Sequence, residues 1–144
     1  MGKTTRRATS MGLMAMATVV AGLLTAPAAN AASWYSSVPT NATNVETVME
    51  AELGSGGYLQ IRRGKYDGRT YLWGRVASPG STYNSDHTLR FQIGLGCASA
   101  TTSKDIDRTT YTSATTRDTD CTYFANIIKR STGKVVKGLQ LNNP

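Results

Sequence analysis

The chain contains 144 residues, with 16 basic and 9 acidic side chains and a formal net charge of +7 at neutral pH. This length favours a single domain and excludes a large multidomain assembly. One histidine and two cysteines exclude the common zinc sites, and we expect neither a metal nor a cofactor.

The first 31 residues have the pattern of an export signal. Basic residues without any acid precede the apolar run Met11–Leu24, and Ala29-Asn30-Ala31 supplies the small residues of a cleavage site. The run is shorter than the roughly 20 residues that span a bilayer, so we expect a cleaved signal peptide and no stable membrane anchor. Arg6-Arg7 leaves both the general secretory route and the twin-arginine route open.

Cleavage after Ala31 lowers the charge of the secreted chain. Three of the 16 basic side chains leave with the signal while all 9 acidic ones stay, so the net charge falls to +4. A weakly basic extracellular protein suits an anionic envelope polymer or polysaccharide. It lacks the dense basic clusters of a dedicated nucleic-acid binder. We therefore expect an extracellular glycan or protein as the ligand.

The first half of the secreted chain contains three strand candidates. Residues 32–44 are rich in polar residues and predict an irregular arm ahead of a single β domain over residues 45–144. Val45–Leu53 fits both a helical stripe and a period of two, and we favour a strand. Tyr58–Arg63 and Arg69–Val76 flank turn-forming residues, which predicts a hairpin.

The second half contains further strand patterns. Leu89–Leu95 alternates strictly between apolar and polar residues, as a half-buried strand does. Thr109–Thr116 fits an edge strand, and Cys121–Arg130 with Val135–Leu141 fits a second hairpin. No helix is indicated. Together these patterns predict an all-β fold, a small antiparallel β-sandwich or barrel of five to seven strands with one disulfide.

Cys97 and Cys121 are the two cysteines of the chain. In an oxidising exterior an even pair predicts a disulfide, which would close a loop of about 25 residues. That disulfide would present residues 98–120 as a long polar loop, in the way that small secreted inhibitors offer a rigid segment to a protease. A secreted protease inhibitor is therefore the second functional hypothesis. Its candidates for the residue that enters the specificity pocket are Lys104, Arg108 and Arg117.

The pairing register of the first hairpin decides which side chains share a face. A four-residue loop pairs Gly64 with Arg69 and gathers aromatic and basic residues on an outer face. A five-residue loop instead turns Tyr71 and Trp73 towards the core, where large aromatic residues mostly lie. An aromatic and basic face suits sugar rings or an acidic protein partner. The candidate binding residues are Tyr58, Arg62, Tyr66, Tyr71, Trp73 and Arg75.

The same hairpin carries a resemblance. Leu59–Gly68 followed by Tyr71–Val76 places an arginine–glycine–tyrosine turn before an aromatic–glycine–arginine strand. This arrangement resembles a pattern in small secreted actinobacterial β-proteins of unknown function. The resemblance implies a hairpin and an exported setting, and it implies no activity.

Catalytic chemistry has weak support in the sequence. His87 lies in a polar loop and is the one candidate general base, although a solvent-exposed loop histidine is the simpler interpretation. Glu50 or Glu52, together with Arg62 and Arg90, would complete the residue types of a small secreted nuclease, without the spacing of a motif. A small hydrolase or nuclease is the third hypothesis. The first is a secreted, non-catalytic binding module for a glycan or cell-envelope polymer.

Two Asp-x-Asp pairs, Asp105-Ile106-Asp107 and Asp118-Thr119-Asp120, offer oxygen ligands of the kind that calcium prefers. Neither pair has the ordered spacing of a known calcium loop. Solvated polar loops are therefore the simpler interpretation of both pairs.

Overall fold

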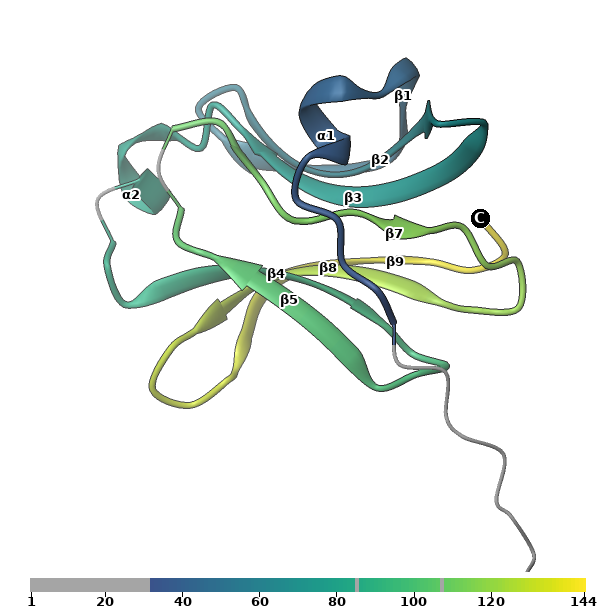
Figure 1. The fold of residues 1–144 in the computed structure, drawn as a ribbon. Coiled ribbons are helices and arrows are strands. Elements are labelled where there is room, and N and C mark those ends of the chain that lie inside the picture. The colour runs from purple at the N-terminus through teal and green to yellow at the C-terminus, as the bar shows by residue number, and fades with distance from the viewer. Residues whose placement is uncertain (1–31, 85, 107) are drawn as a thin grey trace, which may run out of the picture.

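The computed structural model describes residues 32–84, 86–106 and 108–144; the expected signal peptide, residues 1–31, lies outside this part of the chain. Two antiparallel sheets face each other as the layers of a sandwich (Figure 1). The predicted all-β sandwich is therefore confirmed. No helix in the described residues is long and apolar enough to cross a membrane.

Each sheet combines a hairpin with strands from other parts of the chain. In spatial order, the first sheet contains β1 (Thr43–Gly54), β2 (Gly57–Tyr66), β3 (Arg69–Ala77) and, both against β3, the short β6 (Thr110–Tyr111) and β7 (Thr115–Thr116). The second sheet contains β5 (Ala100–Lys104), β4 (Leu89–Leu95), β8 (Tyr123–Lys129) and β9 (Val135–Leu141). The described residues thus hold nine strands, against the five to seven expected, because the sequence pattern does not reveal β5 and Thr109–Thr116 forms two short strands.

The sandwich core forms where alternating strands turn their apolar side chains inward. In β4, Leu89 and Phe91 are buried while Arg90 between them is exposed, which confirms the predicted strand and its faces. Phe91 occupies the space that Gly74 leaves open on β3, since a Cβ at Gly74 would lie 2.4 Å from the Phe91 ring. The buried members of this core are Leu59, Ile61, Leu72, Val76, Leu89, Phe91, Leu95, Ile106, Cys121, Tyr123, Ala125 and Ile127.

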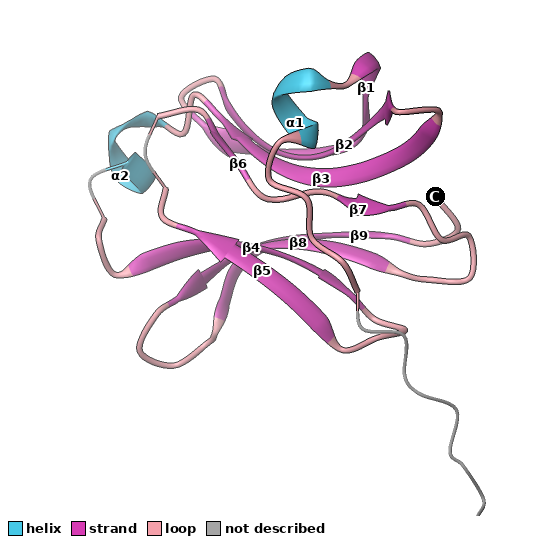
Figure 2. Cartoon of the chain, viewed as in Figure 1, coloured by secondary structure: helices cyan, strands magenta, loops and turns pink. Residues whose placement is uncertain are grey.

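A second, smaller core lies on the outer side of the first sheet. It consists of Val38, Tyr71, Trp73 and Ala114. The short helix α1 (Val38–Asn41) covers this side, above β2 and β3 in Figure 2. Trp73 lies over Gly64, where an added Cβ would be 2.8 Å from the indole ring. The first sheet is therefore buried on both faces near α1.

The N-terminal arm forms the cover of this second core. Two backbone hydrogen bonds join Tyr35 to Ala114, at 2.7 and 2.9 Å, and hold the arm beside the strand segment of β6 and β7. The expectation of a wholly irregular arm over residues 32–44 is wrong, because α1 and the start of β1 lie within it. A second short helix, α2 (Gly80–Asn84), follows β3, so the expectation of no helix is also wrong.

The turn of the first hairpin differs from both predicted loops. Tyr66 pairs with Arg69, so only Asp67 and Gly68 form the loop. Both residues have positive φ, 47° and 71°, as a type I′ turn requires, and its twist matches that of the flanking strands. The pairing is shifted by two residues from the four-residue loop, and an even shift leaves every side chain on the face predicted for that loop.

Two other elements follow their predictions. Val45–Leu53 is part of β1, which confirms the preference for a strand over a helix. Its pairing with β2 contains register shifts, which explains why the sequence alternates imperfectly there. The second hairpin is also confirmed, with β8 and β9 paired antiparallel.

Candidate binding groove and outer face

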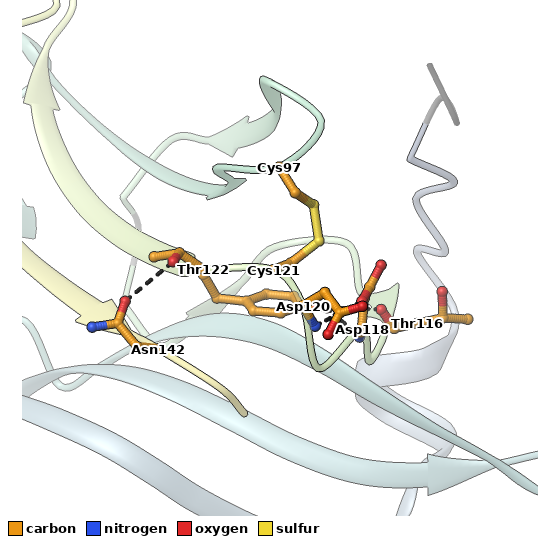
Figure 3. Close-up of a disulfide and its surroundings, with 8 residues drawn as sticks. Cys97, Thr116, Asp118, Asp120, Cys121, Thr122 and Asn142 are labelled. Atoms are coloured by element: carbon orange, nitrogen blue, oxygen red, sulfur yellow. Dashed lines mark hydrogen bonds between the residues drawn. A yellow bond between two sulfur atoms is a disulfide. The ribbon is translucent and has the colours of Figure 1, made fainter. Parts of the chain in front are cut away.

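A disulfide joins the turn after β4 to the start of β8. Cys97 and Cys121 are bonded, with 5.1 Å between their Cα atoms, which confirms the predicted pairing. Figure 3 shows the disulfide beside the loop between β7 and β8, which contains Asp118 and Asp120, with Thr116 beyond them at the end of β7. A hydrogen bond of 3.1 Å from Thr122 to Asn142 ties the same region to the end of β9.

Tyr123 fixes the loop from inside the sandwich. Its buried hydroxyl donates to the Thr116 carbonyl at 3.0 Å and accepts from the Asp118 backbone N–H at 2.8 Å. Burial raises the pKa of the Tyr123 phenol, against the lowering effect of its Asp118 hydrogen bond. The Asp118 carboxylate in turn accepts from the backbone N–H of Asp120 at 2.9 Å. The β7–β8 loop is therefore held in one conformation.

Three adjoining hollows form a groove at this end of the sandwich. They measure about 490, 540 and 240 Å³. The first two share Arg69, Thr116 and Asp118, and the last two share Thr70 and Arg117, so neighbouring hollows border the same side chains. We call this surface the end groove. Its charged and aromatic lining residues are Tyr35, Glu46, Arg63, Lys65, Arg69, Arg117 and Asp118.

The end groove combines a partly exposed aromatic ring with polar groups. Tyr35 is 38% exposed and packs edge-on against Tyr71 with 5.5 Å between ring centroids. Tyr66 makes a similar contact with Tyr71 at 6.3 Å and pairs with the groove residue Arg69. Threonine hydroxyls lie between the charged residues.

The charge of the end groove is positive. Its lining contains four basic and two acidic side chains, and one acid is already paired, since Glu46 lies 2.7 Å from Arg63. Arg117 donates its Nε hydrogen to the Pro144 carbonyl, which leaves its terminal nitrogens to the groove. An elongated polar ligand, neutral or anionic, fits this lining.

A second cluster lies further along the outer face of the first sheet. Arg62 and Arg75 both donate to Gln60 Oε1, at 3.5 and 3.0 Å. We call these two residues the arginine pair. Gln60 Nε2 donates to the Glu50 carboxylate at 3.0 Å, and the Arg75 guanidinium lies 5.6 Å from the centroid of the Tyr111 ring.

Burial and repulsion act on this pair. Burial lowers the pKa of the Arg62 guanidinium, and the like charge of Arg75 lowers it further, while Tyr111 acts in the opposite direction. Arginine stays charged throughout the physiological range, so the effect is to leave a positive charge poorly compensated.

The predicted binding residues divide into two groups. Tyr58 and Tyr66 are each 37% exposed, and both members of the arginine pair reach the surface. Tyr71 and Trp73 share that outer face, as the four-residue loop predicted, but they are 5% and 0% exposed. Their assignment to an exposed binding platform is wrong, because the arm and α1 cover them.

The predicted inhibitor loop is not a loop. Residues 98–120 contain β5, β6 and β7, and buried side chains such as Ile106 and Ala114 anchor them to both sheets. Lys104 belongs to a paired strand, and Arg108 has a positive φ of 48°, unlike the extended backbone that a protease binds. Arg117 is bonded to Pro144. The structure thus places Lys104 on the paired edge strand β5 and Arg108 on non-extended backbone, and it ties Arg117 to the chain end, so none of the three lies on the free extended loop that was expected.

The candidate catalytic residues are dispersed. His87 is exposed in the turn before β4. Glu50 and Arg62 lie on the outer face of the first sheet, whereas Arg90 lies on the outer face of the second. Opposite outer faces of a sandwich cannot contact one substrate bond, so the nuclease arrangement is not formed.

The Asp-x-Asp pairs show no calcium arrangement in the described residues. Asp105 pairs with Arg130, and Asp107 lies outside the described residues. Within the described residues, the one group of three metal-ligating side chains is Cys97, Asp118 and Cys121. Its sulfur atoms are bonded to each other and cannot act as thiolate ligands.

Sequence reasoning missed Tyr35, Arg69, Gln60 and Tyr111. Tyr35 lies in an arm without periodicity, and Tyr111 reaches β3 from a segment far along the chain. The one available signal is the presence of aromatic residues in polar stretches, since tyrosine and tryptophan are enriched at interfaces.

Comparisons with protein-family models, with curated proteins and with solved structures find no significant match to this chain.

Proposed function

We propose that this protein is a secreted, non-catalytic binding module that holds an extracellular glycan or cell-envelope polymer in the end groove. The observation that carries the proposal is the adjacency of three hollows at one end of the sandwich, with Tyr35, Arg69 and several threonines among their lining residues. An aromatic ring packs on the apolar face of a sugar, while arginine and hydroxyl groups bind its oxygens.

The rigidity of the groove supports binding without chemistry. The Cys97–Cys121 disulfide and the two hydrogen bonds of Tyr123 fix its wall before any ligand arrives. A preformed surface loses little conformational entropy on binding. Secretion rests on the export pattern of residues 1–31, and the disulfide fits an oxidising exterior.

The test measures retention of the secreted chain on insoluble polymers. Purified bacterial cell walls, chitin and cellulose are incubated with the wild type and with Tyr35→Ala and Arg69→Ala variants. We expect retention on at least one polymer, weakened about tenfold by either substitution, because stacked aromatics and charge-assisted hydrogen bonds each contribute about 1–3 kcal/mol.

Tyr58→Ala is the matched control. Its ring is as exposed as that of Tyr35, but it lies outside the end groove. Retention should therefore be unchanged in this variant. Absence of retention on every polymer, or equal losses in all three variants, would contradict the proposal.

A further inference from the structure

The arginine pair is a second candidate site, separate from the end groove. Neither Arg62 nor Arg75 lines that groove, and both side chains are half-buried on the outer face of the first sheet. Both direct a terminal nitrogen to one oxygen, Gln60 Oε1. Two guanidinium groups that bind the same oxygen are close enough to repel each other, so the binding of a negative group that contacts both would be favourable.

The described residues supply no such negative group. The ion pairs within them involve other arginines. Among the described residues, the pair donates to neutral oxygens, Gln60 Oε1 and the Glu46 carbonyl, which lies 3.3 Å from Arg62 Nε. Arg75 Nε is buried and has no hydrogen-bond partner among the described residues. Because each guanidinium has five N–H donors, these two oxygens leave donors of the pair without an acceptor among the described residues.

Gln60 binds the Glu50 carboxylate through one side of its amide and the arginine pair through the other. Its Nε2 donates to Glu50 Oε2 at 3.0 Å, while its Oε1 accepts from both arginines. A carboxylate only accepts and a guanidinium only donates, so this amide satisfies both sides in a single orientation. Glu50 is therefore engaged by Gln60, and the donors of the arginine pair stay free of it.

Tyr111 borders both the arginine pair and a separate polar hollow. Its ring stacks near the Arg75 guanidinium at 5.6 Å, which restricts the plane of that group. Tyr111 also lines a separate hollow of about 490 Å³, together with the hydroxyl-bearing Ser36 and Thr40. Neither arginine lines this hollow, so a ligand would reach it from the pair only by extending over Tyr111.

We propose that Arg62 and Arg75 together bind one oxyanion, a carboxylate, sulfate or phosphate group borne by an extracellular ligand. Two adjacent guanidinium groups present several N–H donors to the oxygens of one anion, and such charge-assisted hydrogen bonds are the strong ones. The proposal does not depend on the end groove, because neither Arg62 nor Arg75 lines it.

The test titrates the secreted chain with sodium sulfate, sodium phosphate and sodium glucuronate, each against sodium chloride at equal ionic strength. Heteronuclear NMR of the arginine side-chain N–H groups reports binding at individual residues. We expect saturable shifts at Arg62 and Arg75 with at least one oxyanion and none with chloride. The order of the three affinities identifies whether carboxylate, sulfate or phosphate is preferred.

Variants separate a specific site from general charge. Arg75→Gln should weaken oxyanion binding about tenfold or more, and Arg75→Lys should also weaken it because lysine lacks the planar fork. Glu50→Gln should strengthen binding, since it removes a nearby negative charge. A merely structural role of the arginine pair would not produce that gain.

Arg90→Gln is the charge-matched control. Its side chain is 44% exposed on the other sheet, and its loss leaves Asp105 paired with Arg130. We expect it to leave oxyanion binding unchanged, as should Tyr35→Ala in the end groove. Equal shifts in chloride, or equal losses in Arg75→Gln and Arg90→Gln, would overturn the proposal. Arg75→Lys keeps the test decisive if Arg75→Gln fails to fold.

Discussion

Replacing Trp73 by alanine should destabilise the protein strongly without touching the core between the sheets. Trp73 is fully buried against Val38, Tyr71 and Ala114, on the outer side of the first sheet. A buried tryptophan removes about 150–250 Å² from water, and at about 25 cal/mol/Å² this corresponds to roughly 4–6 kcal/mol. Measured truncations of buried aromatics cost about 3–5 kcal/mol, which is the loss we expect here.

The indole N–H refines this prediction. Trp73 Nε1 is buried and has no hydrogen-bond partner among the described residues. A buried, unsatisfied donor costs about 1–3 kcal/mol, so Trp73→Phe removes that cost while it keeps much of the apolar area. We therefore expect Trp73→Phe to lose much less stability than Trp73→Ala.

Urea unfolding followed by far-UV circular dichroism gives the free energy of unfolding for each variant. The midpoint should fall while the slope stays unchanged, because the same surface is exposed on unfolding. Tyr58→Ala, on the same face but 37% exposed, serves as control and should lose less than about 1 kcal/mol. A loss below about 1 kcal/mol in Trp73→Ala would refute the account of a second core under the arm.

Two further predictions concern the wall of the end groove. Replacing both Cys97 and Cys121 by serine should lower the free energy of unfolding by about 3.5 kcal/mol, as the chain-entropy relation gives for this loop. Thermal unfolding under oxidising conditions measures the loss, and an unchanged stability would show that other contacts alone hold the loop. Tyr123 has a raised pKa, so its contribution to stability is complete below the ordinary value of 10.0 and is lost as pH rises through the higher folded value. Tyr123→Phe should lower the free energy of unfolding by about 1–3 kcal/mol at neutral pH, because it removes both hydrogen bonds of the hydroxyl. It should also reduce the loss of stability at alkaline pH, measured by urea unfolding over that range. An unaltered pH profile would contradict this.

Local pattern was sufficient for most strands. Leu89–Leu95 alternates without interruption, and it forms a strand with the same bounds. A period of two depends only on which face of the strand is buried, so such a strand can be recognised without knowledge of its partner strand. The first hairpin was harder, because the turn rather than the pattern sets the register. Asp67-Gly68 is a recognised two-residue hairpin turn, and that signal would have corrected the longer predicted loops.

Long-range pairing explains the remaining errors. Residues 98–120 are rich in threonine and low in apolar content, so the local pattern predicts a solvated loop. The chain instead passes from β5 in the second sheet to β6 and β7 in the first. Thr112 is buried there and accepts the Gly74 backbone N–H at 2.9 Å, a contact across 38 positions that no local pattern reveals.

The second core under the N-terminal arm changes how binding experiments on this protein must be interpreted. An outer face with tyrosine, tryptophan and arginine predicts a ligand platform. The arm instead buries Tyr71 and Trp73, whereas Tyr35 and the arginine pair stay at the surface. Tyr71 touches Tyr35 directly, so truncation of Tyr71 would displace a groove residue without removing a ligand contact. Loss of binding in a Tyr71 or Trp73 variant is therefore not a sign of ligand contact, whereas loss in a folded Tyr35 or Arg75 variant is.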